Sequence, residues 1–154
     1  MAPALFANQR ETNLASTLVL VEEVLGELGH DAAASRTTGD SALHAWHVHQ
    51  GSALTRVSLV SRTEFTHLRV SSTVMTVDAK VDRAALHAHL LELNAGLCGA
   101  AFATEGDHIL LVAERSTLDL DRSEVRELIK RVTTYADDHD NVLVAKFGGK
   151  LGAT

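Results

Sequence analysis

The chain from residue 82 onward constrains the fold most, because two capped helices enclose a tight hairpin there with almost no connecting chain. Asp82 has the position and chemistry of an N-cap for a helix that ends at Gly96. Alternating apolar residues in 98–114 predict a hairpin, and a longer helix is expected over 121–147. This succession favours a compact α+β domain.

The start of the second helix carries two local signals. Asp121 is followed three residues later by Glu124, which is an aspartate variant of the capping box. Leu120 and Val125 have the spacing of a hydrophobic staple across the same helix start. Apolar residues keep one helical register through 137–141, so we expect one continuous helix, with a break near Asn141 as the alternative.

The N-terminal half predicts one more helix and three strands. A helical apolar face runs from Leu14 to Leu28, with Thr12 or Asn13 as the cap and Gly29 as the stop. Residues 30–40 lack periodicity and are expected to form a loop. Alternation and β-branched residues then predict antiparallel strands, and the change of apolar parity predicts a bulge in the third. The strands span 42–49, 53–61 and 65–77, and the bulge falls at Ser71-Ser72.

The hairpin is expected to turn at Glu105-Gly106-Asp107, with Thr104 paired to Asp107. The complete order is α-β-β-β-α-β-β-α, an α+β fold with one antiparallel sheet. At 154 residues and 45% hydrophobic, the chain has material for one core. We therefore expect a single domain over 1–154 with an ordered core of about 12–149.

Composition limits the compartment. Cys98 is the one cysteine, which excludes an internal disulfide and fits a reducing environment. The first residues lack the basic and apolar regions of a signal peptide, and no run approaches the roughly 20 apolar residues of a membrane span. The sequence therefore predicts a cytoplasmic protein without membrane association.

The net charge of −6 is unevenly distributed. Residues 1–49 carry two basic and six acidic residues, and residues 101–154 carry seven and ten. Residues 50–100 carry five basic against four acidic residues, and so form the one segment that is not acidic. An acidic protein opposes polyanions overall, although a local basic face could still bind one.

Histidines supply the one pattern that suggests metal chemistry. Strand alternation places His47 and His49 on one face, and a third ligand would have to come from a neighbouring strand, with His67 as the candidate. The alternative is a polar sheet face that contacts solvent or a partner subunit. We favour this alternative and expect no metal site.

Enzymatic motifs are absent from the sequence. It contains no GxSxG, HExxH or GxGxxG pattern, and the predicted hairpin register separates Cys98 from His108 by about five residues, roughly 17 Å. We therefore expect a non-enzymatic protein with no catalytic or cofactor-binding residues.

Several features of the C-terminal half resemble YbjN-like proteins, which share the type III secretion chaperone-like fold. These are the Leu93-Asn94 pair that ends a helix, a small-residue strand, the Gly106-Asp107 turn, the Leu120-Asp121 helix entry and the Ala136-Asp137 pair. The resemblance implies a cytoplasmic homodimer that binds segments of other proteins on apolar parts of its helix–sheet surface. It also implies a role as a chaperone, an adaptor or a stress-related regulator.

Two binding hypotheses follow. A protein or peptide client would contact apolar strand residues that are only half covered, for which the candidates are Trp46, Val48, Phe65 and Leu68. The alternative for these residues is ordinary core. The second hypothesis is a nucleic-acid-associated regulator in which basic residues share a sheet face with Phe65, and its candidates are Arg56, Arg62, His67 and Arg69.

Overall fold

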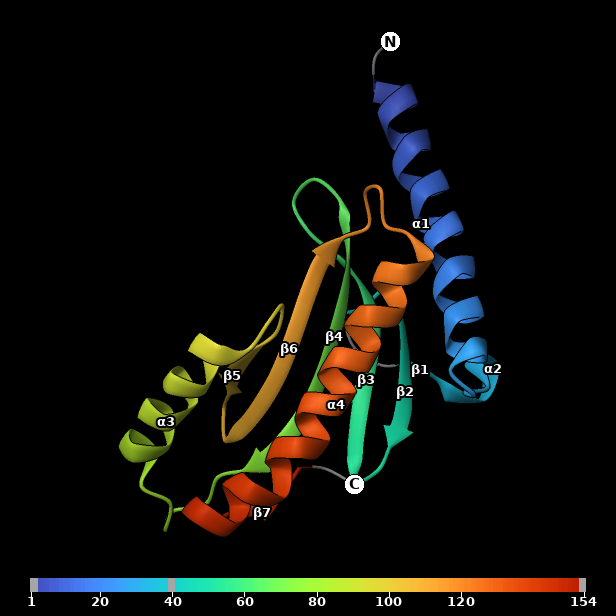
Figure 1. The fold of residues 1–154 in the computed structure, drawn as a ribbon. Coiled ribbons are helices and arrows are strands. Elements are labelled where there is room, and N and C mark those ends of the chain that lie inside the picture. The colour runs from blue at the N-terminus through green and yellow to red at the C-terminus, as the bar shows by residue number, and fades with distance from the viewer. Residues whose placement is uncertain (1–2, 39–40, 153–154) are drawn as a thin grey trace.

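The computed structural model describes residues 3–38 and 41–152. Its elements are α1 (Pro3–Glu27), α2 (Ala32–Ser35), β1 (Arg36–Thr37), β2 (His44–Gln50), β3 (Ala53–Ser61), β4 (Thr66–Thr76), α3 (Arg83–Gly96), β5 (Ala101–Glu105), β6 (His108–Ser116), α4 (Arg122–Phe147) and β7 (Lys150–Leu151). The predicted order of three main helices and five main strands is confirmed, and α2, β1 and β7 are additions (Figure 1).

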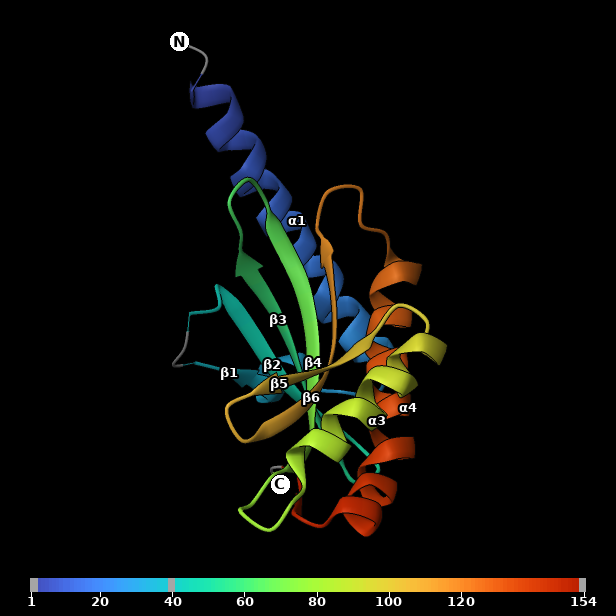
Figure 2. The same cartoon turned by 90° about the vertical axis from the view of Figure 1, so that its left-hand side faces the viewer.

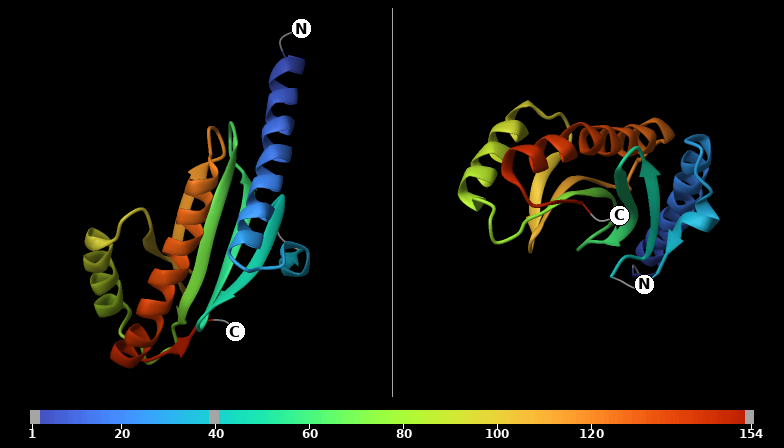
Figure 3. Two further views of the ribbon diagram at one scale, coloured as in Figure 1. Left: turned by 45° about the vertical axis from the view of Figure 1, so that its right-hand side comes forward. Right: turned by 90° about the horizontal axis from the view of Figure 1, so that it is seen from below.

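All seven strands form one antiparallel sheet in the order β1-β2-β3-β4-β6-β5. The short strand β7 pairs with the end of β4, at Met75 and Thr76. Figure 2 shows the sheet from the β5 side, with α3 and α4 on one side of it. Seen from below in Figure 3, the sheet curves around α4, and the opposite face is free of helices in the described part of the chain.

The core lies between the sheet and α4. Strand alternation sends Val57, Leu59, Leu68 and Val70 to this side, and each is 0% exposed. The buried residues of α4 recur at helical spacing from Val125 to Leu143, and α1 adds Val21, Val24 and Leu25. Burial of each large side chain contributes roughly 1.5–3 kcal/mol. In the described part of the chain, no helix has the length and apolar character needed to cross a membrane.

The caps of the two C-terminal helices form as expected. The Asp82 side chain accepts a hydrogen bond from the Ala85 backbone N–H (3.1 Å). At α4, the Asp121 carboxylate accepts from the Glu124 N–H (3.0 Å), and the Glu124 carboxylate accepts from the Asp121 N–H (2.9 Å). The complete capping box fixes where α4 begins, and α4 continues without a break to Phe147.

Helix α1 begins earlier than predicted. The expected cap at Thr12 or Asn13 is wrong, because the helix already runs from Pro3, and proline is compatible with a first helical position. Asn13 instead makes a tertiary contact, since its Nδ2 donates to the Thr117 carbonyl (3.2 Å) and its Oδ1 accepts from the Thr117 hydroxyl (2.6 Å). A residue with capping chemistry therefore serves to attach α1 to the loop before α4.

Three other local predictions need correction. Part of the loop expected at 30–40 forms α2 and β1, which are too short to show periodicity. The irregularity in β4 lies between Thr73 and Met75 and not at Ser71-Ser72, which pair regularly with β3 and β6. The hairpin pairs Glu105 with His108, so its loop contains only two residues and Thr104 faces Ile109. Gly106, with φ +58°, permits this tighter turn.

The outer edge of β5 is closed by a side chain. β5 ends the sheet, so one side of its backbone has no neighbouring strand. The Phe102 N–H donates to Asn94 Oδ1 (2.7 Å), and Asn94 Nδ2 donates to the Phe102 carbonyl (3.3 Å). The asparagine at the end of α3 thus imitates one residue of a missing strand, which protects this edge against pairing with another chain.

Replacing Asn94 by alanine would leave the N–H of buried Phe102 without its partner. We expect the free energy of unfolding to fall by about 1–3 kcal/mol, measured by urea unfolding. The control is Asp138→Ala, at an exposed position of α4. It should change stability by no more than about 0.5 kcal/mol, and equal losses in both variants would contradict the assigned role of Asn94.

Candidate functional site

The helix-free side of the sheet, here called the open face, carries the polar half of each strand pattern. In β3 and β4, the residues that alternate with the core residues are mostly polar: Arg56, Ser58, His67, Arg69, Ser71 and Thr73, with Leu54 and Val60 as the apolar exceptions. The register sets Arg56 opposite Ser71 and Ser58 opposite Arg69. Because paired residues share a face, two arginines and two serines of adjacent strands form one polar surface.

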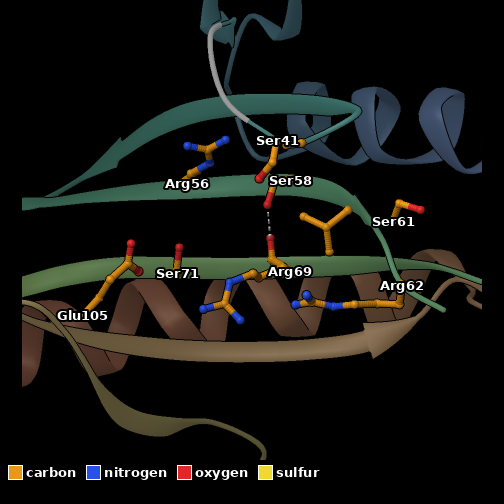
Figure 4. A pocket seen from close by; sticks show the side chains of 10 residues that line it. Ser41, Arg56, Ser58, Ser61, Arg62, Arg69, Ser71 and Glu105 are labelled. Atoms are coloured by element: carbon orange, nitrogen blue, oxygen red, sulfur yellow. Dashed lines mark hydrogen bonds between the residues drawn. The ribbon is translucent and has the colours of Figure 1, made fainter.

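This surface is hollowed into a pocket of about 430 Å³. Figure 4 shows the residues that line it, with Arg56 on β3 and the side chains of Arg62 and Arg69 next to each other beside β4. Ser58 is only 3% exposed, and its hydroxyl donates to the Arg69 carbonyl (3.2 Å). The pocket floor is therefore a fixed part of the sheet, and the longer arginine side chains form its accessible part.

One carboxylate organises two of these arginines. Arg62 binds Glu114 through two bonds, Nε to Oε1 (2.6 Å) and Nη2 to Oε2 (2.7 Å), and Arg69 Nη1 binds Oε2 (2.8 Å). The hydrogen bonds from Arg62, with those from Arg69, lower the pKa of Glu114 from 4.5 to about 2. Glu114 remains ionised at neutral pH and holds both guanidinium groups in place.

Two more pockets continue the hollow along the strands. The second, of about 300 Å³, shares Arg56, Ser71 and Glu105 with the first and adds Leu54 and Leu110. A third, of about 270 Å³, shares Leu54 with the second and is also lined by Leu151. We call these three adjoining pockets the sheet groove. It begins among arginines and serines and becomes more apolar toward β7.

The apolar residues predicted to contact a client are mostly inaccessible. Trp46 and Leu68 are 0% exposed and Val48 is 1% exposed, so the expectation that they are half covered is wrong. Their side chains point to the core face, beneath α1 and α4. Trp46 also lies under the Arg36 guanidinium, 5.7 Å from the ring centre, and its indole N–H has no hydrogen-bond partner among the described residues.

Phe65 lies apart from these residues and from the sheet groove. It is half-buried and lines a separate pocket of about 550 Å³ with Asn13 and Leu118. Arg56, Arg62 and Arg69 do share a pocket, as the basic-face hypothesis expected, but none of the ten residues lining it is aromatic. The predicted combination of base stacking with charge neutralisation is therefore not assembled.

The three histidines considered for metal binding are separated by the strand register. His47 lies opposite Arg56, whereas His67 lies opposite Val60, four residues further along β3 and two strands away from β2. Four residues correspond to roughly 13 Å, which is too far for shared coordination. Within 3–38 and 41–152, no group of three histidine, cysteine or acidic residues could hold a metal ion.

The sequence analysis missed Glu114, Glu105 and the serines of the groove. Glu114 lies directly opposite Arg69 because β4 pairs with β6. The two residues are 45 positions apart in the chain, so no local pattern indicates that they meet. Single serines on an alternating strand do not differ in sequence from ordinary exposed positions. A usable signal was the alternation of Arg56, Ser58, Arg69 and Ser71 across the first hairpin pair, which places them on one face.

Comparison with known proteins decides the family. A family model described as T3SS (YopN, CesT) and YbjN peptide-binding chaperone 1, or TY-Chap1, matches residues 15–153. The chain belongs to this family. The resemblance to YbjN-like proteins is thereby confirmed. No curated protein matches this chain.

Solved structures share the fold of this chain at low sequence identity. The ExsC-ExsE complex has a TM-score of 0.63 at 13% identity, covering 84% of this chain and 94% of the other. The HopA1-SchA chaperone-effector complex has 0.58 at 12%, with coverages of 85% and 97%. The Yersinia pestis type III secretion chaperone SycH, in complex with a stable fragment of YscM2, has 0.51 at 18%, with 81% and 97%. The predicted secretion chaperone-like fold is confirmed.

The ion pairs of Glu114 with Arg62 and Arg69 should stabilise the fold to an extent that depends on pH. Because the folded pKa of Glu114, about 2, is below 4.5, this contribution is present above pH 4.5 and is lost as the pH falls toward 2. We expect urea unfolding to give wild type a larger free energy of unfolding than Glu114→Gln at pH 7. This difference should vanish as the pH approaches about 2. Glu127→Gln, at an exposed position of α4, is the control and should run parallel to wild type. A constant gap between wild type and Glu114→Gln would contradict the ion-pair assignment.

Proposed function

We propose that this chain is a non-enzymatic chaperone that binds an extended segment of another protein in the sheet groove. The observation that carries the proposal is the hollow that runs along the open face and reaches α4 at its far end, where Asp140 lines the third pocket. Membership of a family of peptide-binding chaperones supports it, as do three similar structures that are complexes of two proteins.

The dimensions of the groove favour an extended client. Along β3 it reaches from Ser61 to Leu54, which spans seven residue steps or roughly 23 Å. A segment of about seven residues in extended conformation would fill that length, whereas a folded domain could contact only the rim. The hydroxyl of half-buried Ser71, which lines the first two pockets, can donate to and accept from the backbone of such a segment.

Photocrosslinking in the native host tests the location. A benzoylphenylalanine at Glu105, which is exposed and lines the first two pockets, should crosslink one polypeptide at a discrete segment identified by mass spectrometry. The same group at Lys130, exposed on α4, should not. Equal crosslinking at both positions, or none at Glu105, would contradict a client in the sheet groove.

We also propose that the chain forms a homodimer through α3. This helix buries Leu86 and Leu90 toward the sheet, while Leu91 is 70% exposed on another face. α3 lies beside β5, the terminal strand of the sheet, so a second copy could cover both elements at once (Figure 2). An exposed leucine next to a sheet edge is a suitable centre for such a contact.

Leu91→Arg should separate the dimer. A buried guanidinium without a partner is costly, so sedimentation at micromolar concentration should give a particle of 16.5 kDa for the variant and twice that for wild type. Val142→Arg, at a position of α4 that is 56% exposed, is the matched control and should sediment like wild type. A wild-type protein of 16.5 kDa at every concentration would refute the proposal.

The cellular role follows from where the client is held. We propose the cytoplasm as the compartment, which the exposed free thiol of Cys98 supports because such thiols persist in reducing surroundings. A protein that holds one segment of a client in its sheet groove could act as a chaperone or as an adaptor, including one with a role in stress. A partner recovered after nuclease treatment of the lysate would support this role, and loss of the partner on nuclease treatment would favour the nucleic-acid alternative.

A further inference from the structure

One end of the sheet groove is positively charged, although the chain as a whole is acidic. Arg56, Arg62 and Arg69 line its polar end, with Glu105 at the rim and Glu114 bound to two of the arginines. Within it, Arg62 and Arg69 share the single carboxylate of Glu114, so these three side chains together carry a surplus of positive charge in a chain whose net charge is −6. A ligand that complements this end must carry negative charge.

The Arg62–Glu114–Arg69 cluster is suited to a second carboxylate. Each guanidinium has five N–H donors, and the bonds to Glu114 use two from Arg62 and one from Arg69. The arginine side chains are 46% and 30% exposed, so an incoming group can reach them.

The rest of the groove is better suited to an apolar side chain than to a charged one. Beyond Ser71 its apolar lining residues are Leu54, Leu110 and Leu151, of which Leu151 is 44% exposed. The lining also includes Thr73, three histidines and, at the far end, Asp140. On β4, Arg69 and Thr73 mark the two zones, and they lie four residues or roughly 13 Å apart. An extended peptide advances by the same rise per residue, so side chains four positions apart would reach both zones.

We propose that the client segment is acidic at one end and apolar at the other, with an aspartate or glutamate about four positions from a leucine, isoleucine or valine. The acidic side chain binds the Arg62–Glu114–Arg69 cluster, and the apolar one packs on Leu54 and Leu110. This inference rests on the proposed function, because it specifies the chemistry of the segment that the chaperone holds.

A peptide fits this groove better than a nucleic acid does. The lining of the arginine pocket contains no aromatic residue, and Glu105 and Glu114 would repel a run of phosphates. The apolar zone offers contacts to aliphatic side chains and has no equivalent use for a sugar–phosphate backbone. One carboxylate at the cluster followed by an apolar residue uses both halves of the groove.

The test is a selection of phage-displayed random peptides of about twelve residues on the full-length chain. Selected peptides are then synthesised with a fluorescent label, together with versions in which each acidic residue is replaced by its amide. Their dissociation constants are measured by fluorescence anisotropy at about 50 mM salt, where charge contacts between exposed groups are weakly screened. The protein forms are wild type, Arg62→Gln/Arg69→Gln, Glu114→Gln and the control Arg83→Gln.

We expect the two sets of substitutions to change the affinity for acidic peptides in opposite directions. The double arginine variant should weaken binding of acidic peptides by about tenfold or more, whereas Glu114→Gln, which removes the competing carboxylate, should strengthen it by about fivefold. A merely structural role of the cluster would weaken binding in both. Arg83→Gln removes an exposed ion pair between Arg83, at the start of α3, and Asp107 in the turn between β5 and β6 (2.7 Å). It should leave peptide binding unchanged.

Outcomes separate this inference from the proposed function. Enriched peptides with the acidic and apolar pattern, together with the gain in Glu114→Gln, would support it. Enriched peptides without excess acidic residues, or equal binding of the amide versions, would overturn it while leaving peptide binding intact. Enrichment of no peptide would overturn both. Displacement of selected peptides by a single-stranded oligonucleotide at lower concentration than by unlabelled peptide would overturn it in favour of nucleic acid.

Discussion

The packing of α4 against one face of the sheet is the contact on which the rest of the structure depends. Val57, Leu59 and Val70 become core residues because α4 covers them, and the capping box at Asp121 sets where that helix begins. Since strand residues alternate between faces, burying this half of the pattern forces Arg56, Ser58, Arg69 and Ser71 to the opposite side. A slip of one residue in either strand would send arginines to the core. The sheet groove is therefore a direct consequence of the core and needs no additional element.

The edges of the sheet are treated differently from its open face. At β5, the Asn94 amide satisfies the N–H and the carbonyl of Phe102, and near the end of β4 the short strand β7 pairs with Met75 and Thr76. Gly149 and Gly152 allow this approach, because a Cβ at either would lie within 3 Å of a β4 carbonyl oxygen. These contacts occupy backbone groups that could otherwise pair with another chain. The groove, which is lined by side chains of alternate strand residues, does not depend on these backbone groups, which is consistent with the client site proposed above.

Much of the fold could be predicted from local patterns, and most of the site could not. Asp82, Asp121 and Gly106 act within a few residues of their own position, so their spacing identified two helix starts and the hairpin. Trp46, Val48 and Leu68 were harder to assign, because alternation shows that they share a face but not whether a helix covers it. Asn13 had capping chemistry and a tertiary role, and only the proximity of Thr117 distinguishes the two. Glu114 became part of the site through a strand pairing that no local pattern reveals.

The sequence by itself determined the element order, the two well-marked C-terminal helices, the alternation of the strands and the resemblance to YbjN-like proteins. It did so because capping, turn formation and side-chain periodicity depend on residues that are close in the chain. The tertiary structure alone decided which strand face is buried, that Arg62 and Arg69 share Glu114, and that His47 and His67 lie far apart. These outcomes depend on the register between strands distant in sequence and on the docking of α4. Both are fixed by the burial of apolar area over the whole chain and not by any local segment.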